Sequence, residues 1–214
     1  MFFSKFSIFV RLHDGVASVL WGMIRDIVTY GDPVLREKCR PIVHITEDVR
    51  VLAADMIDTM RAADGVGLAA PQVGVALQIA VVDVSHSPES SSYLKVDGTE
   101  VAMADWMPLI FVNPKLEFGL VRQSEAEGCL SLPDVRGNVE RPMDVRATLT
   151  LLDGREIVLE SDGLLARAIQ HEVDHLNGIL FTDRVSSAAK VRLRGLLKRF
   201  LAERGPRRYT PGKP

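Results

Sequence analysis

Cysteine is scarce in this sequence. The 214 residues contain only Cys39 and Cys129. Two cysteines are too few for a disulfide framework, which small secreted domains use to compensate for a limited core. A single bridge between them stays open, but the count favours a reduced, intracellular environment.

Long apolar runs and a strong net charge are also missing. The uncharged stretches of residues 1–22 are shorter than the about 20 apolar residues that a bilayer-spanning helix needs. Hydrophobic residues make up 47%, charged residues 25%, and the formal net charge is −2. These values, the length and the absence of an internal repeat predict one domain with a sizeable core.

The charge is unevenly distributed along the chain. From residue 185 onward nine basic residues face Glu203 alone, a net charge of +8, so residues 1–184 carry −10. An acidic body with a basic tail favours an anionic partner for the tail. The nine basic residues are Lys190, Arg192, Arg194, Lys198, Arg199, Arg204, Arg207, Arg208 and Lys213.

Residues 1–22 form an apolar N-terminal extension. Lys5, Arg11 and the serines suggest a weak targeting segment, which leaves an organellar destination open, but no convincing small-residue cleavage site follows. The alternative is that Met23 is the natural start and residues 1–22 are a mis-called extension. We favour a dispensable extension.

The most informative stretch is HEVDH at residues 171–175. On a helix, residues four apart lie one turn above each other, so His171 and His175 can direct two imidazole nitrogens at one metal ion. Glu172 flanks them, where its carboxylate can reach a metal-bound water. By itself the pattern is equally compatible with ordinary helical histidines.

The flanking sequence predicts a well-delimited helix. Ser161 or Asp162 can cap its N-terminus, and Asn177-Gly178 supplies a stop. Helical periodicity comes from Leu164, Leu165, Ala168 and Ile169.

A third ligand is available in EGCLSLP, residues 127–133. A lone cysteine is usually a small buried hydrophobe, but Cys129 follows a glycine and precedes a serine-to-proline turn, which predicts a bend. A thiolate suits zinc or ferrous iron, and a Cys-His-His set leaves a fourth position for water.

The rest of the chain predicts strands and one further helix. Thr46–Ala63 is expected to be helical, with Thr46 as cap and a core stripe. Gln78–Val84, Leu109–Val112 and Met143–Leu152 are expected strands, with turns at Asp97-Gly98 and Asp153-Gly154 and a strand end at Asn113-Pro114. Strands that precede a central helix indicate an α+β fold. The stripe consists of Val49, Leu52, Met56 and Met60.

GVGLAAPQ at residues 65–72 contains two closely spaced glycines. It lacks the third glycine and the lysine of phosphate-binding loops. By itself it is typical of a loop that leaves a helix. Gln72 is its one side chain able both to donate and to accept hydrogen bonds.

Together, GDPVLR at 31–36, GVGLAAPQ, EGCLSLP and HEVDHLNG at 171–178 resemble the motifs of peptide deformylase. The resemblance covers a catalytic domain of residues 23–184 and leaves 185–214 as a basic C-terminal helix and tail. It implies antiparallel β-sheets around a central metal-binding helix. It also implies removal of the formyl group from formyl-methionine of nascent polypeptides, in a bacterial-type cytoplasm.

The resemblance assigns the central roles. Cys129, His171 and His175 would hold one divalent metal ion, ferrous iron in the cell, which zinc, nickel or cobalt can replace on purification. Glu172 would be the general acid and base. Gln72 and the backbone N–H of Leu130 would stabilise the oxyanion.

It also assigns the substrate contacts. The Gly67 backbone would contact the substrate, Arg136 would lie near the entrance, and the methionine pocket would be lined by Val66, Leu164 and Ala168. Arg167 departs from the family, whose members often carry an apolar residue there, so the rim of the pocket is left open.

Residues Val185 to Gly205 predict an amphipathic helix. One interpretation is a docked helix with a solvated charged face. The other is contact with ribosomal RNA near the exit tunnel, as the family's basic C-terminal helix can make, which phosphate contacts would render salt-sensitive. The apolar stripe consists of Leu193, Leu196, Leu197, Phe200 and Leu201.

Two other functions compete with this interpretation. Metalloproteases with an HExxH motif take their third ligand from downstream, where only Asp183 and Glu203 are available, so the upstream Cys129 favours a deformylase. A non-catalytic, ribosome-associated protein on a decayed scaffold is disfavoured by the intact Glu172, Gln72 and ligand set.

If residues 1–22 are dispensable, a chain expressed from Met23 should fold and keep its activity. Circular dichroism and turnover of the two chain lengths, compared side by side, check this. Loss of either property in the shorter chain would show that the extension is needed.

Overall fold

The structure is a computed structural model that describes residues 8–10, 18–20, 22–87 and 90–212. Its centre is a seven-stranded sheet in the order β4-β5-β8-β11-β12-β6-β7, and every neighbouring pair is antiparallel. The strands are β4 (Gly67–Ala69), β5 (Ile79–Val82), β6 (Leu94–Val96), β7 (Thr99–Glu100), β8 (Leu109–Phe118), β11 (Asp144–Thr150) and β12 (Glu156–Asp162).

Two helices cover opposite faces of this sheet, α1 (Glu47–Ala62) and α2 (Gly163–Leu176). Successive side chains of a strand point to opposite faces of the sheet. Because a helix covers each face, all four residues of β5 are buried. Ala80 and Val82 belong to the core beneath α2, whereas Ile79 and Val81 belong to the core beneath α1. The sheet therefore separates two apolar cores.

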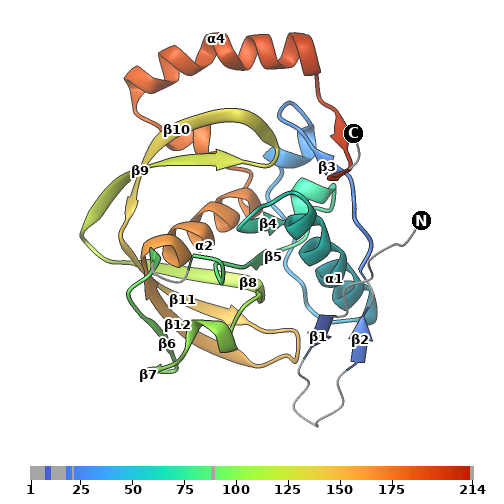
Figure 1. The fold of residues 1–214 in the computed structure, drawn as a ribbon, viewed down its shortest axis with the longest axis vertical. Helices are drawn as coiled ribbons and strands as arrows, with labels where there is room; N and C mark the ends of the chain where they lie inside the picture. The colour runs from blue at the N-terminus through green and yellow to red at the C-terminus, as the bar shows by residue number, and fades with distance from the viewer. Residues whose placement is uncertain (1–7, 11–17, 21, 88–89, 213–214) are drawn as a thin grey trace.

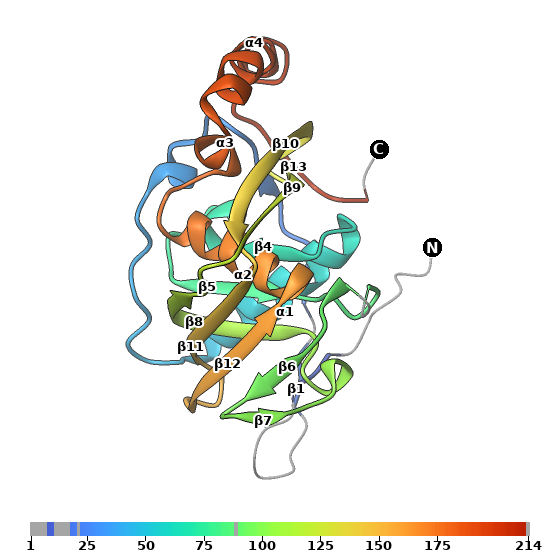
Figure 2. The same cartoon turned by 90° about the vertical axis from the view of Figure 1, so that its left-hand side faces the viewer.

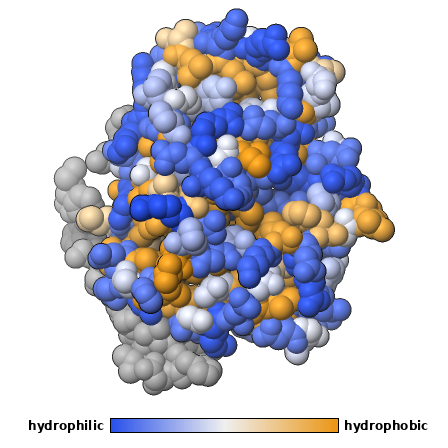
Figure 3. All heavy atoms as spheres, turned by 180° about the vertical axis from the view of Figure 1, so that it is seen from behind, coloured by the Kyte–Doolittle hydropathy of each residue, from blue (hydrophilic) through white to orange (hydrophobic). Residues whose placement is uncertain are grey.

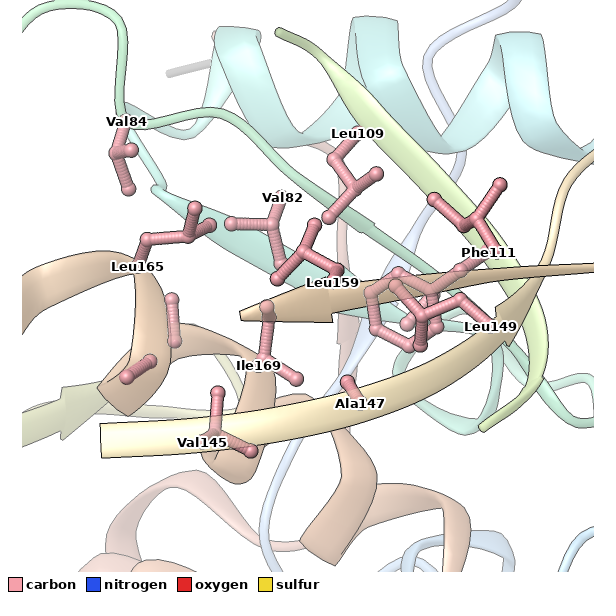
Figure 4. Packing of buried hydrophobic residues seen from close by; sticks show 14 of the residues in the cluster. Val82, Val84, Leu109, Phe111, Val145, Ala147, Leu149, Leu159, Leu165 and Ile169 are labelled. Atoms are coloured by element: carbon pink, nitrogen blue, oxygen red, sulfur yellow. The ribbon is translucent and has the colours of Figure 1, made fainter. Parts of the chain in front are cut away.

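The core beneath α2 fixes the orientation of that helix. Leu165 and Ile169 are fully buried and lie among side chains of β5, β8, β11 and β12 (Figure 4). Burying one such side chain stabilises the fold by about 1.5–3 kcal/mol. His171 follows Ile169 by two positions, about 200° around the helix, so the histidines face away from the sheet.

A second, two-stranded sheet lies on that other side of α2. It consists of β9 (Arg122–Cys129) and β10 (Leu132–Pro142), joined by the turn residues Leu130 and Ser131. Figures 1 and 2 show α2 between this hairpin and the seven-stranded sheet.

The remaining elements surround this arrangement. Beyond α2 come α3 (Phe181–Arg184) and α4 (Ser187–Arg204), and β13 (Arg208–Tyr209) then pairs with β3 (Ile27–Val28). Short 3-10 helices span Pro33–Arg36, Ala70–Val73 and Met103–Asp105.

Part of the N-terminal extension is described. Strands β1 (Ile8–Val10) and β2 (Ser18–Leu20) pair antiparallel. The targeting features Lys5, Arg11 and most of the serines lie outside the described residues. The Met23 backbone N–H donates to Oδ1 of buried Asp55 at 2.6 Å, and a chain beginning at Met23 would place its terminal ammonium beside the same carboxylate.

The predicted α+β fold is confirmed, as are the helix with its buried stripe and the turns at Asp97-Gly98 and Asp153-Gly154. The predicted strand end at Asn113-Pro114 is wrong. Asn113 adopts a φ of +50° and the β8–β11 register shifts there, so a bulge lets the strand continue to Phe118. Thr46 precedes α1, but its side chain makes no capping hydrogen bond.

The predicted tail helix is present, but its apolar stripe docks only in part. Leu193 and Phe200 are buried against β10 and α3, whereas Leu196 and Leu201 are exposed. Figure 3 shows hydrophilic and hydrophobic residues intermixed at the top, where α4 lies. Within the described ranges, no helix is long and apolar enough to cross a membrane.

Candidate active site

The N-terminus of α2 is held by the loop before β6. The Leu165 N–H donates to the Ser91 hydroxyl at 3.0 Å. Asp162 occupies the predicted cap position, but its carboxylate accepts from the Ser92 N–H at 2.7 Å rather than from the helix. Gly163 has a φ of +57°, and a Cβ there would lie 2.0 Å from the Ser90 carbonyl oxygen, so this close contact requires glycine.

The three predicted ligands converge at the other end of α2. Cys129 ends β9, and His171 and His175 lie one helical turn apart. Their ligand atoms all lie within 4.8 Å of one another, and Cys129 Sγ is 3.3 Å from His175 Nε2. Gln72 donates from Nε2 to Cys129 Sγ at 3.5 Å.

This donor set fits a divalent metal ion. His171 Nδ1 lies 3.0 Å from Glu127 Oε2, which holds the ring and leaves Nε2 as the ligand atom, the usual arrangement around metal-binding histidines. One thiolate and two imidazoles suit zinc or ferrous iron and leave a coordination position open.

Glu127 is the centre of a buried charge network that sequence reasoning missed. Arg141 donates to both of its carboxylate oxygens, at 2.6 and 2.9 Å, and to Asp174 at 2.8 Å. The Arg184 guanidinium also donates to the Asp174 carboxylate, at 2.6 Å. Burial favours a raised pKa for Glu127, but hydrogen bonds from His171 and Arg141 override it and hold that pKa well below its usual range. Glu127 is therefore anionic at neutral pH.

Arg167, which was expected at the rim of the pocket, belongs to the same network. Its guanidinium donates to Glu127 at 2.7 Å and to the carbonyls of Val139 and Gln123 at 3.1 and 3.0 Å. Its Nε lies 3.1 Å from a carboxylate oxygen of Glu125. Arg167 thus joins α2 to both strands of the hairpin, and its charge is paired with the carboxylates of Glu125 and Glu127.

Glu172 is buried beside the ligands. It is 3% exposed, and Oε2 has no hydrogen-bond partner among the described residues. Burial raises the pKa of Glu172 to about 7, in the range that general acid–base catalysis near neutral pH requires. A Cβ on Gly67 would lie 2.3 Å from Glu172 Oε1, so glycine at 67 leaves room for this carboxylate.

One cavity of about 560 Å³ unites the predicted residues. Of the predicted site residues, His175 alone does not line it, being 1% exposed behind the cavity wall. Arg167 and Tyr209 line it as well. The predicted residues in the wall are Val66, Gly67, Gln72, Cys129, Leu130, Arg136, Leu164, Ala168, His171 and Glu172.

Comparison with known proteins identifies the family. Residues 24–191 match the family described as polypeptide deformylase. The chain belongs to this family. The peptide deformylase of Prochlorococcus marinus (strain AS9601) is 43% identical over 163 residues, which cover 76% of this chain and 74% of that relative. The peptide deformylase of Acinetobacter baumannii (strain SDF) is 38% identical over 180 residues, 83% of this chain and 92% of that one.

Solved peptide deformylases share the fold. The enzyme from Ehrlichia chaffeensis superposes with a TM-score of 0.71 at 32% identity, covering 82% of this chain and 96% of that one. The Synechococcus elongatus enzyme, solved in complex with actinonin, gives 0.67 at 38% identity, covering 86% and 87%.

Membership establishes the class of reaction. Peptide deformylases are metal-dependent hydrolases that remove the N-terminal formyl group from nascent polypeptides. The predicted family is confirmed, and the metalloprotease alternative fails. Its candidate ligand Asp183 instead accepts hydrogen bonds from Arg36 and the Leu180 N–H, and Glu203 is exposed on α4.

Replacing Gly67 by alanine should displace the Glu172 carboxylate while leaving the fold intact. We expect kcat to fall about 100-fold, because a shift of about 1 Å in a reacting group has an effect of this order. Formate release from a formylated peptide measures it. Gly195→Ala is the matched control, since a Cβ there meets nothing within 4 Å. Full activity of Gly67→Ala would show that a Cβ at position 67 does not displace the Glu172 carboxylate.

Proposed function

We propose that Cys129, His171 and His175 hold one divalent metal ion, ferrous iron in the cell, and that Glu172 is the general acid and base for deformylation of formyl-methionyl peptides. The observation that carries this proposal is the carboxylate of Glu172, which is buried in the cavity wall beside the Cys-His-His set and whose Oε2 has no hydrogen-bond partner among the described residues. The same donors accept zinc, nickel or cobalt.

When bound, the metal lowers the pKa of a water and polarises the formyl oxygen. Glu172 takes a proton from the attacking water. It then returns the proton to the departing amine nitrogen, so that formate and a free N-terminus result. A carboxyl whose pKa lies near neutrality can perform both transfers.

Two donors stabilise the negative charge that develops on the formyl oxygen. One is the backbone N–H of Leu130 and the other is Nε2 of Gln72. Oε1 of Gln72 accepts from the Ala69 N–H at 2.7 Å, which fixes the amide so that Nε2 faces the Cys129 sulfur. Loss of one such donor typically raises the barrier by about 2.7–4 kcal/mol.

The cavity walls provide the substrate contacts. Val66, Leu164 and Ala168 form the apolar lining that receives the methionine side chain, and the Gly67 backbone pairs with the substrate. Arg136 is exposed at the mouth, where it meets the following residues of the peptide. A substrate of this kind places the enzyme where translation starts with formyl-methionine, as in bacterial cytoplasm.

Glu172→Ala should retain metal and lose turnover, whereas Cys129→Ala should lose both. Anaerobic release of formate from formyl-Met-Ala-Ser, with metal content determined on the same preparation, checks this. Wild-type protein should contain about one metal ion per chain. A metal-loaded wild type that left the peptide formylated would overturn the proposed reaction.

We also propose that α4 contacts ribosomal RNA near the exit tunnel. Its basic side chains lie on the exposed face of the helix, including Lys190, Arg194 and Lys198. The remainder of the helix docks through Leu193 and Phe200, so the charged face is available without unfolding. Phosphate contacts of this kind release counterions and weaken with salt.

Replacement of Lys190, Arg194 and Lys198 by glutamine should weaken ribosome co-sedimentation without changing turnover of a free peptide. The slope of log K for ribosome binding against log salt concentration should become shallower by about one for each lost phosphate contact. The control carries glutamine at Lys38, Arg40 and Lys115, which are also exposed. Equal binding by both triple variants would dismiss α4 as the contact.

A further inference from the structure

The C-terminal strand reaches the catalytic cavity. Tyr209 on β13 lines the cavity together with Cys129 and Glu172. Its phenolic O–H donates to the backbone carbonyl of Leu130 at 2.9 Å. Burial raises the pKa of Tyr209, so the hydroxyl remains a donor throughout the neutral range.

Leu130 is the residue whose backbone this hydroxyl holds. It follows Cys129 and is the first of the two turn residues between β9 and β10. Among the described residues, Tyr209 is the one side chain that hydrogen-bonds to the Leu130 backbone. The Tyr30 N–H holds the next carbonyl, that of Ser131, at 2.7 Å. The turn is therefore fixed at two successive carbonyls.

The N–H and the carbonyl of Leu130 belong to successive peptide planes that meet at one Cα atom. A hydrogen bond on the carbonyl fixes the second plane and the position of this Cα atom, and so limits how far the N–H can be displaced from the cavity that Leu130 lines. Donors of an oxyanion hole act through such fixed orientation, because no reorganisation is then needed as charge develops.

Strand β13 is itself firmly placed. Tyr209 lies opposite Ile27 of β3. Beside this pair, the Thr29 N–H donates to the Arg207 carbonyl at 2.8 Å, and the Arg207 N–H donates to the Thr29 hydroxyl at 2.9 Å. These bonds hold the tail without the Tyr209 hydroxyl, so docking of the tail and orientation of Leu130 can be separated by experiment.

We propose that Tyr209 is a positioning residue for deformylation, whose hydroxyl holds the backbone of Leu130 in place so that its N–H meets the developing oxyanion. This inference rests on the proposed role of the Leu130 N–H. It assigns the tail beyond α4 a function in turnover that neither the motifs nor the charge of the tail indicates.

The test is Tyr209→Phe, which removes the hydroxyl and keeps the ring. We expect kcat to fall about tenfold, less than for loss of a donor itself, which costs about 10²–10³. KM, metal content and Tm should stay near the wild-type values. Tyr30→Phe is the matched control, because the ring of Tyr30 packs edge-on against Phe200 and its hydroxyl has no hydrogen bond among the described residues.

The outcomes separate the inference from the proposed function. A lowered kcat in Tyr209→Phe alone, at unchanged KM and Tm, supports positioning. Wild-type kcat in Tyr209→Phe overturns it, as does a kcat loss shared with Tyr30→Phe or accompanied by a matching fall in Tm. Wild-type protein and Glu172→Ala, assayed in parallel, report on the proposed function itself, which fails only if wild type releases no formate or Glu172→Ala releases it normally.

Discussion

The site depends on how the cysteine-bearing hairpin is held against the histidine-bearing helix. The two histidines lie on α2, and the cysteine ends β9, which belongs to a sheet separate from the seven-stranded one. Two buried ion pairs join these elements, Arg167 of α2 with Glu127 of β9 and Arg141 of β10 with Asp174 of α2. Because the guanidinium groups donate in a fixed planar geometry, they set the register between hairpin and helix, which apolar contacts alone would leave free to slide.

The helix is therefore held in two different ways on its two sides. Apolar packing fixes the side that faces the large sheet, and ionic hydrogen bonds fix the side that faces the hairpin. Removal of one partner from a buried ion pair costs about 3–5 kcal/mol, because the remaining charge stays buried. An exposed pair such as Arg204–Asp134 contributes about 0–1 kcal/mol. The site is thus most sensitive to substitution at a few buried charges next to it.

Local sequence patterns predicted the parts of this structure that are local. The limits of α2, the stripe of α1 and the turns at Asp97 and Asp153 each follow from periodicity or turn chemistry within a few residues. The cap of α2 could not be predicted, because it comes from Ser91, 74 residues away. The Glu127–Arg141 and Arg141–Asp174 pairs span 14 and 33 residues and leave no periodic trace. The position of Glu127, two residues before Cys129 in the same motif, was a signal that could have indicated its role. Nothing in the sequence around Tyr209 indicated a role for that residue.

The bond between Tyr209 and Leu130 joins residues 79 positions apart, and this separation has a consequence for how the protein is made. During synthesis the chain emerges from its N-terminus, and contacts between distant residues form late. The large sheet, α2 and the hairpin are complete in sequence once residue 176 has been added, but the turn beside the cysteine still lacks its partner. A growing chain can thus complete its large sheet, α2 and the hairpin before Tyr209 is available to hold the turn beside the cysteine.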